Sequence, residues 1–139
     1  MAALGAAILL AGCGGVAEVG LPMDAEAPVC ADAVWPQHVA DAPRVTTRPQ
    51  SPAIAAWGSP AIIARCGLPA LAPTTDECVT VNGIDWVVRS LTDGSAATTF
   101  GRDPAIEVLA PARYGPVPLL LPVFADVAKS LPTNGRHCT

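Results

Sequence analysis

Five cysteines are the residues of this 139-residue chain whose type and spacing point most directly to chemistry. No pair has the Cys-x-x-Cys spacing of a redox motif, and neither the cysteines nor His38 and His137 have the close spacing of zinc ligands. We therefore expect no metal and no cofactor. Cysteines of an exported chain pair into disulfides, so an odd count leaves one cysteine for another role.

Cys13 is the cysteine expected to have the separate role, because it follows an apolar run and the residues Leu10-Ala11-Gly12. The tetrad looks like the lipobox of bacterial lipoproteins, in which a signal peptidase cuts before a cysteine that carries the lipid. The run is far shorter than the ~20 apolar residues that span a bilayer. We expect residues 1–12 to be a signal peptide, Cys13 to be lipidated, and the protein to be held on the extracytoplasmic side of the cell membrane.

The absence of positive charge near the N-terminus leaves alternatives to the signal-peptide interpretation open. A signal peptide normally begins with positive charge, yet no Lys or Arg precedes Arg44. Either the true start lies upstream of Met1, or the Ala-rich N-terminus is buried and Cys13 is an ordinary thiol.

The other four cysteines, Cys30, Cys66, Cys78 and Cys138, are expected to form two disulfides. Four cysteines allow three pairings, and the sequence alone does not choose among them. A short loop containing Gly67 joins Cys66 to Cys78, and Cys30 and Cys138 lie at the two ends of the domain, which are often close together. We favour Cys66–Cys78 and Cys30–Cys138.

Three charged residues, Asp85, Arg89 and Glu107, are predicted to lie on the outer face of a sheet. If that face is open, they form a patch that holds a polar ligand or takes part in acid–base chemistry. Alternatively, they form cross-strand ion pairs that each contribute ~1 kcal/mol or less. Trp57 and Trp86 are candidates for a stacking platform that takes a sugar or peptide, although Trp on a hairpin's inner face more often belongs to the core. We place Trp86 in the core and expect Trp57, beside a Gly-Ser-Pro turn, to be the more exposed of the two.

The composition argues against nucleic-acid binding. The chain has a formal charge of −4, and its eight Lys and Arg residues are scattered singly, whereas phosphate binding needs clustered basic residues. The 15 Pro and 12 Gly predict a loop-rich fold with short elements.

The chain is expected to divide into three parts. Residues 1–12 form the signal peptide, residues 13–28 the lipidated cysteine with a flexible linker, and residues 29–139 a disulfide-stabilised domain. The linker is predicted because residues 14–28 are small, acidic and interrupted by Pro and Gly, with no helical or strand period. An irregular first strand is the alternative for this segment.

The clearest local pattern is a β-hairpin over residues 78–91. Two β-rich runs flank Asn82-Gly83, a dipeptide that favours a type I′ turn because both central residues need positive φ. A two-residue loop sets the register so that Val81 lies opposite Ile84. One face then collects Val79, Val81, Ile84, Trp86 and Val88, and the other collects Thr80, Asp85 and Arg89.

Weaker patterns predict the remaining elements. Leu120, Phe124, Val127 and Leu131 recur at helical spacing, which predicts an amphipathic helix over residues 119–131. A short helix over residues 30–40 is expected to lay Trp35 on the core, and strands are expected over residues 44–51, 61–66, 97–102 and 105–110. The fold class expected is α+β, a small antiparallel sheet of four or five strands on which an N-terminal and a C-terminal helix pack, with two disulfides.

Taken in order, these segments resemble domain of unknown function 3515, a family of short exported actinobacterial proteins. The resemblance is carried by the Cys30 helix, residues 57–67 (WGSPAIIARCG), Cys78 with residues 81–86 (VNGIDW), residues 100–105 (FGRDPA) and a last cysteine after the helix. Trp35 departs from it, since Leu is expected before Pro36. The resemblance implies an envelope protein, often lipid-anchored, with no assigned activity and therefore no catalytic residue to carry over.

Two functions from different classes follow from these patterns. We favour a non-catalytic lipoprotein that binds or scaffolds an envelope protein or a glycan at the outer face of the cytoplasmic membrane. The alternative is an enzyme, or an enzyme accessory, that acts on cell-wall material through the face of Asp85, Arg89 and Glu107. Only the enzyme needs these three side chains in one concave pocket.

Overall fold

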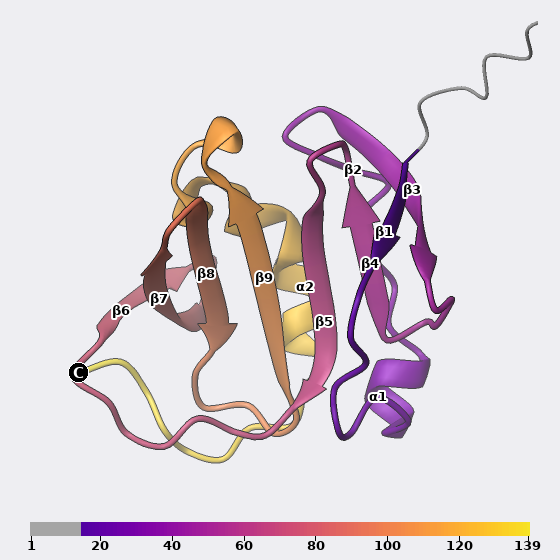
Figure 1. The fold of residues 1–139 in the computed structure, drawn as a ribbon. Helices are drawn as coiled ribbons and strands as arrows, with labels where there is room; N and C mark the ends of the chain where they lie inside the picture. Colours follow the sequence, from indigo (N-terminus) through magenta and orange to yellow (C-terminus); the bar gives the residue numbers. More distant parts are fainter. Residues whose placement is uncertain (1–14) are drawn as a thin grey trace, which may run out of the picture.

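A computed structural model describes residues 15–139 and shows a chain that is mostly β (Figure 1). The strands are β1 (Val16–Glu18), β2 (His38–Val39), β3 (Ala42–Arg48), β4 (Ile54–Trp57), β5 (Ile62–Leu68), β6 (Glu77–Val81), β7 (Ile84–Leu91), β8 (Gly94–Thr99) and β9 (Ala105–Pro111). They form one nine-stranded sheet in the order β1-β3-β4-β5-β9-β8-β7-β6, with β2 also paired to β3. The sheet is mixed, because β1 runs parallel to β3.

The expected α+β fold with a four- or five-stranded antiparallel sheet is therefore wrong. Segments that were expected to be linker or helix add strands to the sheet: β1 comes from the presumed linker, and β2 comes from the end of the presumed N-terminal helix. That helix is reduced to the single turn of α1 (Pro28–Ala31). Short strands of two or three residues carry too little periodicity to be recognised without their pairing partner.

The C-terminal helical segment is only partly an α-helix. It begins with two 3₁₀ segments, η1 (Ala112–Tyr114) and η2 (Val117–Phe124), and continues as α2 (Ala125–Lys129). Pro122 lies inside η2 and has no N–H for the α-helical hydrogen bond, which accounts for the tighter winding before α2. The predicted apolar face is nevertheless confirmed, because Leu120, Phe124, Val127 and Leu131 are all buried.

Residues 15–27 pack on the domain instead of forming a flexible linker. β1 pairs with β3 from Val16 to Glu18, and Val19 is buried. Farther along, the Asp24 N–H donates to the Gly67 carbonyl at 2.9 Å. Gly67 has φ +116°, and a Cβ there would lie 2.6 Å from the backbone of Asp24, so only glycine permits this close approach. The structure thus matches the alternative of an irregular first strand.

The hairpin prediction is confirmed in turn and register. Asn82 and Gly83 both have positive φ, and β6 pairs with β7 so that Val81 lies opposite Ile84 and Val79 lies opposite Trp86. Ile84 and Trp86 are buried in the core. The opposite side of the hairpin belongs to the outer face of the sheet, which carries no helix (Figure 1).

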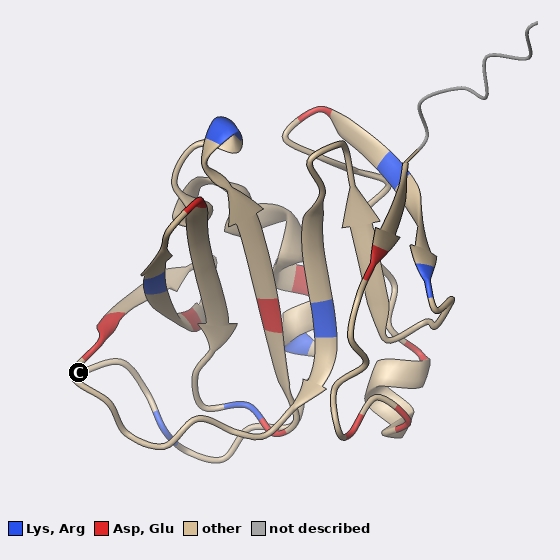
Figure 2. Cartoon of the chain, in the orientation of Figure 1, with Lys and Arg blue, Asp and Glu red and all other residues tan. Residues whose placement is uncertain are grey.

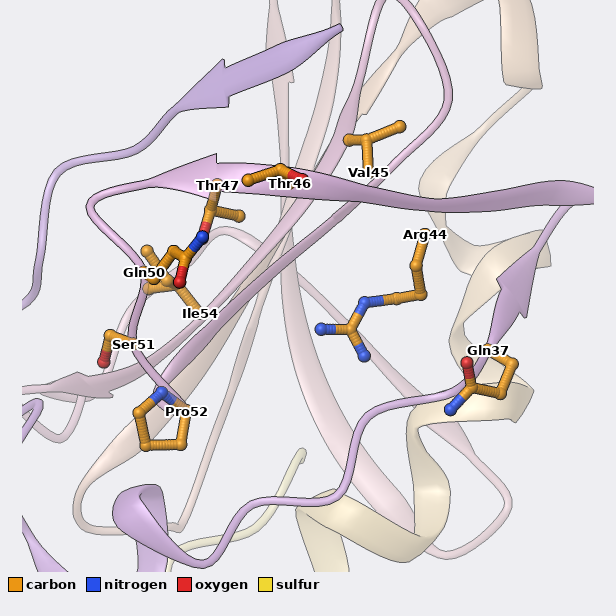
Figure 3. Close-up of a pocket in the computed structure, with 9 residues that line it drawn as sticks. All are labelled: Gln37, Arg44, Val45, Thr46, Thr47, Gln50, Ser51, Pro52 and Ile54. Atoms are coloured by element: carbon orange, nitrogen blue, oxygen red, sulfur yellow. The ribbon is translucent and has the colours of Figure 1, made fainter. Parts of the chain in front are cut away.

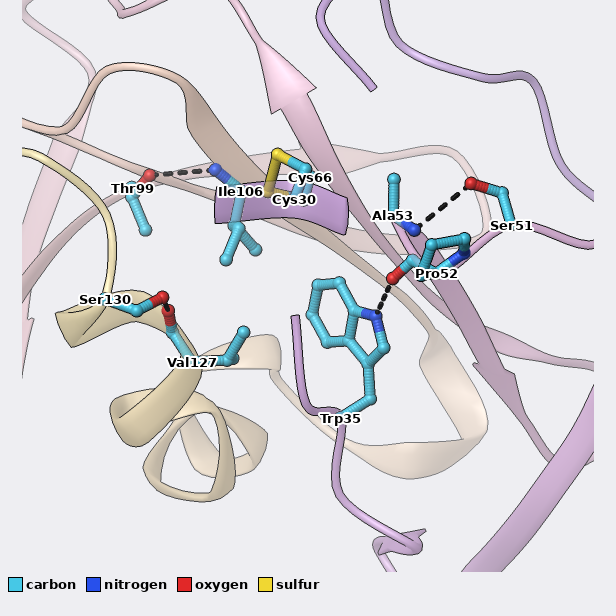
Figure 4. The surroundings of a disulfide bond; sticks show 10 residues. All are labelled: Cys30, Trp35, Ser51, Pro52, Ala53, Cys66, Thr99, Ile106, Val127 and Ser130. Atoms are coloured by element: carbon cyan, nitrogen blue, oxygen red, sulfur yellow. Dashed lines mark hydrogen bonds between the residues drawn. A yellow bond between two sulfur atoms is a disulfide. The ribbon is translucent and has the colours of Figure 1, made fainter. Parts of the chain in front are cut away.

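The inner face of the sheet packs against η2 and α2 through aromatic side chains. Trp57 and Phe124 meet edge to face with ring centroids 5.5 Å apart, and Trp35 lies 6.5 Å from Trp57 and 6.4 Å from Phe124. Trp35 is buried in the core, as predicted, and donates its Nε1–H to the Pro52 carbonyl at 2.8 Å (Figure 4).

The two disulfides join Cys30 to Cys66 and Cys78 to Cys138, so the favoured pairing is wrong although all four cysteines are bonded. Cys66 lies on β5 and Cys78 on β6, and β9, β8 and β7 separate these strands in the sheet. Four strand spacings amount to about 19 Å, far more than the ~7 Å that a disulfide bridges between Cα atoms. The Cys30–Cys66 bond is fully buried beside Trp35 and Ile106 (Figure 4).

Candidate functional site

Glu107, on the outer face of the sheet, is neutralised by a cross-strand partner. Arg65 on β5 lies directly opposite Glu107 on β9, and its Nη2 and Nε donate to Glu107 Oε1 at 2.7 and 3.1 Å. Figure 2 shows the two opposite charges side by side on these adjacent strands. Arg65 also donates to the Gly20 carbonyl at 3.1 Å and so holds the N-terminal segment on the sheet. The ion-pair alternative describes Glu107 correctly.

Asp85 is engaged by groups near the C-terminus. Its carboxylate accepts hydrogen bonds from the Thr80 hydroxyl at 2.6 Å and from the Cys138 backbone N–H at 2.9 Å, and His137 Nδ1 lies 3.6 Å away. Burial by itself raises the pKa of Asp85, but the hydrogen bonds from Thr80 and Cys138, together with His137, outweigh it and hold the pKa below its ordinary value. Asp85 is therefore a structural anion that docks the C-terminal tail.

Arg89 is the third residue of the predicted patch, but it lies apart from both Asp85 and Glu107. Asp85 and Arg89 point to the same face of β7 four residues apart, which corresponds to about 13 Å along a strand. Glu107 lies two strands away and opposite Thr98, which in turn faces Val87. The three charged side chains thus share a face but belong to three separate environments, and they do not converge on one pocket.

Trp57 is not the partly exposed platform that the sequence predicts. It is fully buried, and its Nε1–H donates to the Pro36 carbonyl at 2.9 Å. Its ring instead supports Arg44, whose guanidinium carbon lies 5.7 Å from the ring centroid. A guanidinium in this position gains a favourable cation–π interaction and loses rotational freedom.

A cleft opens beside Arg44 where β3 leaves β4. β3 pairs with β4 through Arg44 and Val45, whereas its last three residues pair with β1. The separated strands leave a cleft of about 590 Å³, which we call the Arg44 cleft (Figure 3). It is lined by Gln37, Arg44, Val45, Thr46, Thr47, Gln50, Ser51, Pro52 and Ile54.

The Arg44 cleft offers one positive charge and a set of neutral hydrogen-bonding groups. Figure 3 shows the Arg44 side chain extending between Gln37 and the loop of Gln50 to Pro52. The three ion pairs formed within residues 15–139 do not include Arg44. The guanidinium therefore remains available to an anion, and the amides of Gln37 and Gln50 are exposed around it.

The sequence patterns did not predict this cleft, although they made Trp57, the residue on which Arg44 stacks, a candidate for ligand binding. Its polar residues come from the segment before β2, from β3 and from the loop after it, and they form no motif of fixed spacing. The available signal was an arginine among neutral polar residues in a β-prone run that includes Thr46 and Thr47.

Residues 15–139 contain no group of three or more His, Cys, Asp and Glu side chains placed to hold a metal ion. Over the same residues, no helix is both long and apolar enough to cross a membrane. The predicted signal peptide and lipidated Cys13 lie outside the described residues.

A family model described as "Protein of unknown function (DUF3515)" matches residues 12–135. The chain belongs to this family. The match to DUF3515 covers the Arg44 cleft, three of the disulfide cysteines and the outer face, and it extends to Gly12 and Cys13 at the predicted lipobox. Neither the curated proteins nor the solved structures contain a match to the chain.

Proposed function

We propose that the protein is a non-catalytic binding module, anchored through a lipid on Cys13 at the outer face of the cytoplasmic membrane. Its Arg44 cleft takes a carboxylate-bearing peptide segment of an envelope protein. The observation that supports this function is the Arg44 guanidinium, which rests over the Trp57 ring and has no acidic partner among residues 15–139.

The ligand class follows from the chemistry of the lining. A guanidinium presents its N–H groups as a planar fork that matches the two oxygens of a carboxylate. The side-chain amides of Gln37 and Gln50 both donate and accept, so they suit the N–H and C=O groups of a peptide backbone. Val45 and Ile54 add an apolar part to the lining, and the volume lies within the ~300–1,000 Å³ usual for small-ligand sites.

A catalytic role receives no support from this cleft. A guanidinium donates hydrogen bonds but is a poor group for transferring a proton. The lining contains no Asp, Glu, His, Cys or Lys that acts as a general acid, base or nucleophile. The enzyme hypothesis depended on Asp85, Arg89 and Glu107 sharing a pocket, and these side chains have separate surroundings.

A peptide titration tests the ligand class. The purified chain is titrated with short N-acetylated peptides ending in a free carboxylate, with their amidated counterparts and with cell-wall glycan fragments, and binding is followed by NMR shifts of residues 44–54. We expect the carboxylate peptides to bind and Arg44→Gln to weaken them about tenfold, as expected for loss of a charge-assisted hydrogen bond. Arg89→Gln is the matched control and leaves binding unchanged.

Three results would contradict the proposed ligand. The first is that Arg44→Gln binds the peptides as tightly as the wild-type chain. The second is that amidated peptides bind equally well, and the third is that glycan fragments displace the peptides. Each result would show that the guanidinium is not a carboxylate receptor. Membrane anchoring is tested separately with Cys13→Ala, which should release the chain from membranes; unchanged membrane association would exclude the lipid anchor.

A further inference from the structure

The chain leaves the described domain very close to Cys13. Two residue steps separate Cys13 from Gly15 and span about 7 Å at most. A Cβ placed on Gly15 would lie 3.9 Å from the Ser59 Oγ, so the turn between β4 and β5 is the part of the domain next to the emerging chain. A lipid on Cys13 would therefore hold this turn at the level of the headgroups.

The same turn is fixed to a second exposed segment. Arg113 donates to the Ser59 carbonyl at 3.1 Å, and the Tyr114 hydroxyl donates to the Pro60 carbonyl at 2.8 Å. The Arg113 guanidinium carbon lies 5.4 Å from the Tyr114 ring centroid. Tyrosine and arginine both combine an apolar body with a polar end, which suits the boundary between headgroups and acyl chains.

Apolar side chains surround this pair of segments. A cleft of about 680 Å³ runs from Pro60 to Leu91, and a neighbouring cleft of about 530 Å³ has Leu91 in common with it. Leu91 is 43% exposed, and Leu119, whose Cδ1 would lie 3.9 Å from a Cβ on the cleft residue Gly115, is 73% exposed. Exposed apolar side chains grouped around a cleft mark interaction sites on otherwise polar surfaces.

Charge does not dominate this surface. Arg113 is its exposed cation, Asp93 lines the same cleft, and Glu77 lines the neighbouring cleft. One cation beside two acidic residues gives no net attraction to anionic headgroups, so a bilayer would be contacted mainly by apolar side chains and interfacial Tyr and Arg, with a weak dependence on salt.

We infer that this end of the domain lies against the phospholipid surface, through the Ser59–Ala61 turn, Leu91, Arg113, Tyr114 and Leu119, which we call the anchor end. The inference rests on the proposed lipid anchor, because a lipid on Cys13 would bring the Ser59–Ala61 turn, and the segment bonded to it, close to the bilayer. The opposite end of β5 lies about 20 Å farther out. Met23, which is 86% exposed beside the Asp24–Gly67 contact, marks that distal end.

Photocrosslinking to lipid tests the orientation. The lipidated full chain is reconstituted in vesicles of phosphatidylcholine with a minority of phosphatidylglycerol, with p-benzoylphenylalanine placed singly at Leu91, Leu119 or Met23. All three positions are exposed, so the replacements are matched, and thermal melting checks that each variant folds. We expect several-fold more lipid adduct from positions 91 and 119 than from position 23.

Hydrogen exchange of the unsubstituted lipidated chain provides a second measurement. Vesicles should slow exchange in residues 91–94 and 112–119 and leave residues 22–27 unchanged. Equal adduct yields at all three positions, or slower exchange at residues 22–27 alone, would overturn the orientation while leaving the anchor intact. Mass spectrometry of the exported chain tests the lipid anchor separately. A Cys13 without lipid would overturn the anchor and, with it, the proposed orientation.

Discussion

Arg65 and Arg44 lie on opposite sides of the same sheet, and only Arg65 is neutralised within the described chain. Arg65 is paired with Glu107 at 2.7 Å, with side-chain exposures of 25% and 9%. Arg44 instead stands over Trp57 at the edge of a cleft without acidic lining residues. The charged residues Asp85 and Glu107, which are conspicuous in the sequence, therefore have structural roles, whereas Arg44, the residue suited to binding, has an inconspicuous sequence context.

The largest effect on stability is expected when the Arg65–Glu107 ion pair is removed. Glu107→Gln leaves the Arg65 guanidinium partly buried without a counter-charge, and we expect it to lower the free energy of unfolding by about 2 kcal/mol, less than for a fully buried pair because Arg65 remains partly exposed. Urea unfolding measures the change. The matched control is Glu18→Gln, which removes the exposed Glu18–Arg48 pair and should change stability by less than ~0.5 kcal/mol. Equal effects of the two variants would show that burial of the pair is unimportant.

The next prediction tests whether the planar guanidinium of Arg44, and not only its charge, contributes to peptide affinity. Arg44→Lys keeps the charge but loses the planar fork and its stacking on Trp57, so we expect peptide affinity to fall about threefold, between the unchanged chain and Arg44→Gln. Because Arg44 is exposed, neither variant should shift Tm appreciably. Calorimetric titration and thermal melting measure the two quantities. A Lys variant that binds as tightly as the unchanged chain would reduce the role of Arg44 to that of a simple positive charge.

An effect of similar size concerns the stability contributed by Asp85 and depends on pH. Its folded-state pKa lies below the ordinary value, so its stabilisation is fully present above pH ~4 and is lost as pH falls through the folded-state pKa. We expect Asp85→Asn to lower Tm by about 3 °C at pH 7, a change typical of ~1 kcal/mol in a domain of this size. The difference from the unchanged chain should shrink on acidification below pH 4. A difference that is constant from pH 7 to pH 2 would contradict an ionised Asp85 as the stabilising group.

The smallest effect is expected at Arg89, the remaining member of the predicted patch. Arg89 is exposed and takes part in none of the ion pairs within residues 15–139. Arg89→Gln should therefore leave both stability and peptide binding unchanged, within ~0.5 kcal/mol for the free energy of unfolding. A loss of binding in this variant would return the outer face to consideration as a ligand site.

Some features of the molecule were accessible from the sequence because they depend on neighbours along the chain. Asn82-Gly83 specifies a tight turn, and a two-residue loop leaves a single register, so the hairpin and its core side chains were predicted correctly. The helical spacing of Leu120, Phe124 and Val127 identified the buried side of the C-terminal segment even though its first part is 3₁₀. Family membership was also predicted correctly from the order of these local segments.

Other features were decided only by the tertiary structure, because they depend on strand order. The parallel pairing of β1 with β3 brings residues 15–27 onto the sheet, and the insertion of β9 between β5 and β8 separates Cys66 from Cys78. The same order places Arg65 opposite Glu107, and the divergence of β3 from β4 opens the Arg44 cleft above a buried Trp57. Residue type and spacing thus determined which groups were available, and long-range strand pairing decided which were bonded to each other and which stayed free, since strands far apart in the chain select their neighbours through the packing of the whole sheet.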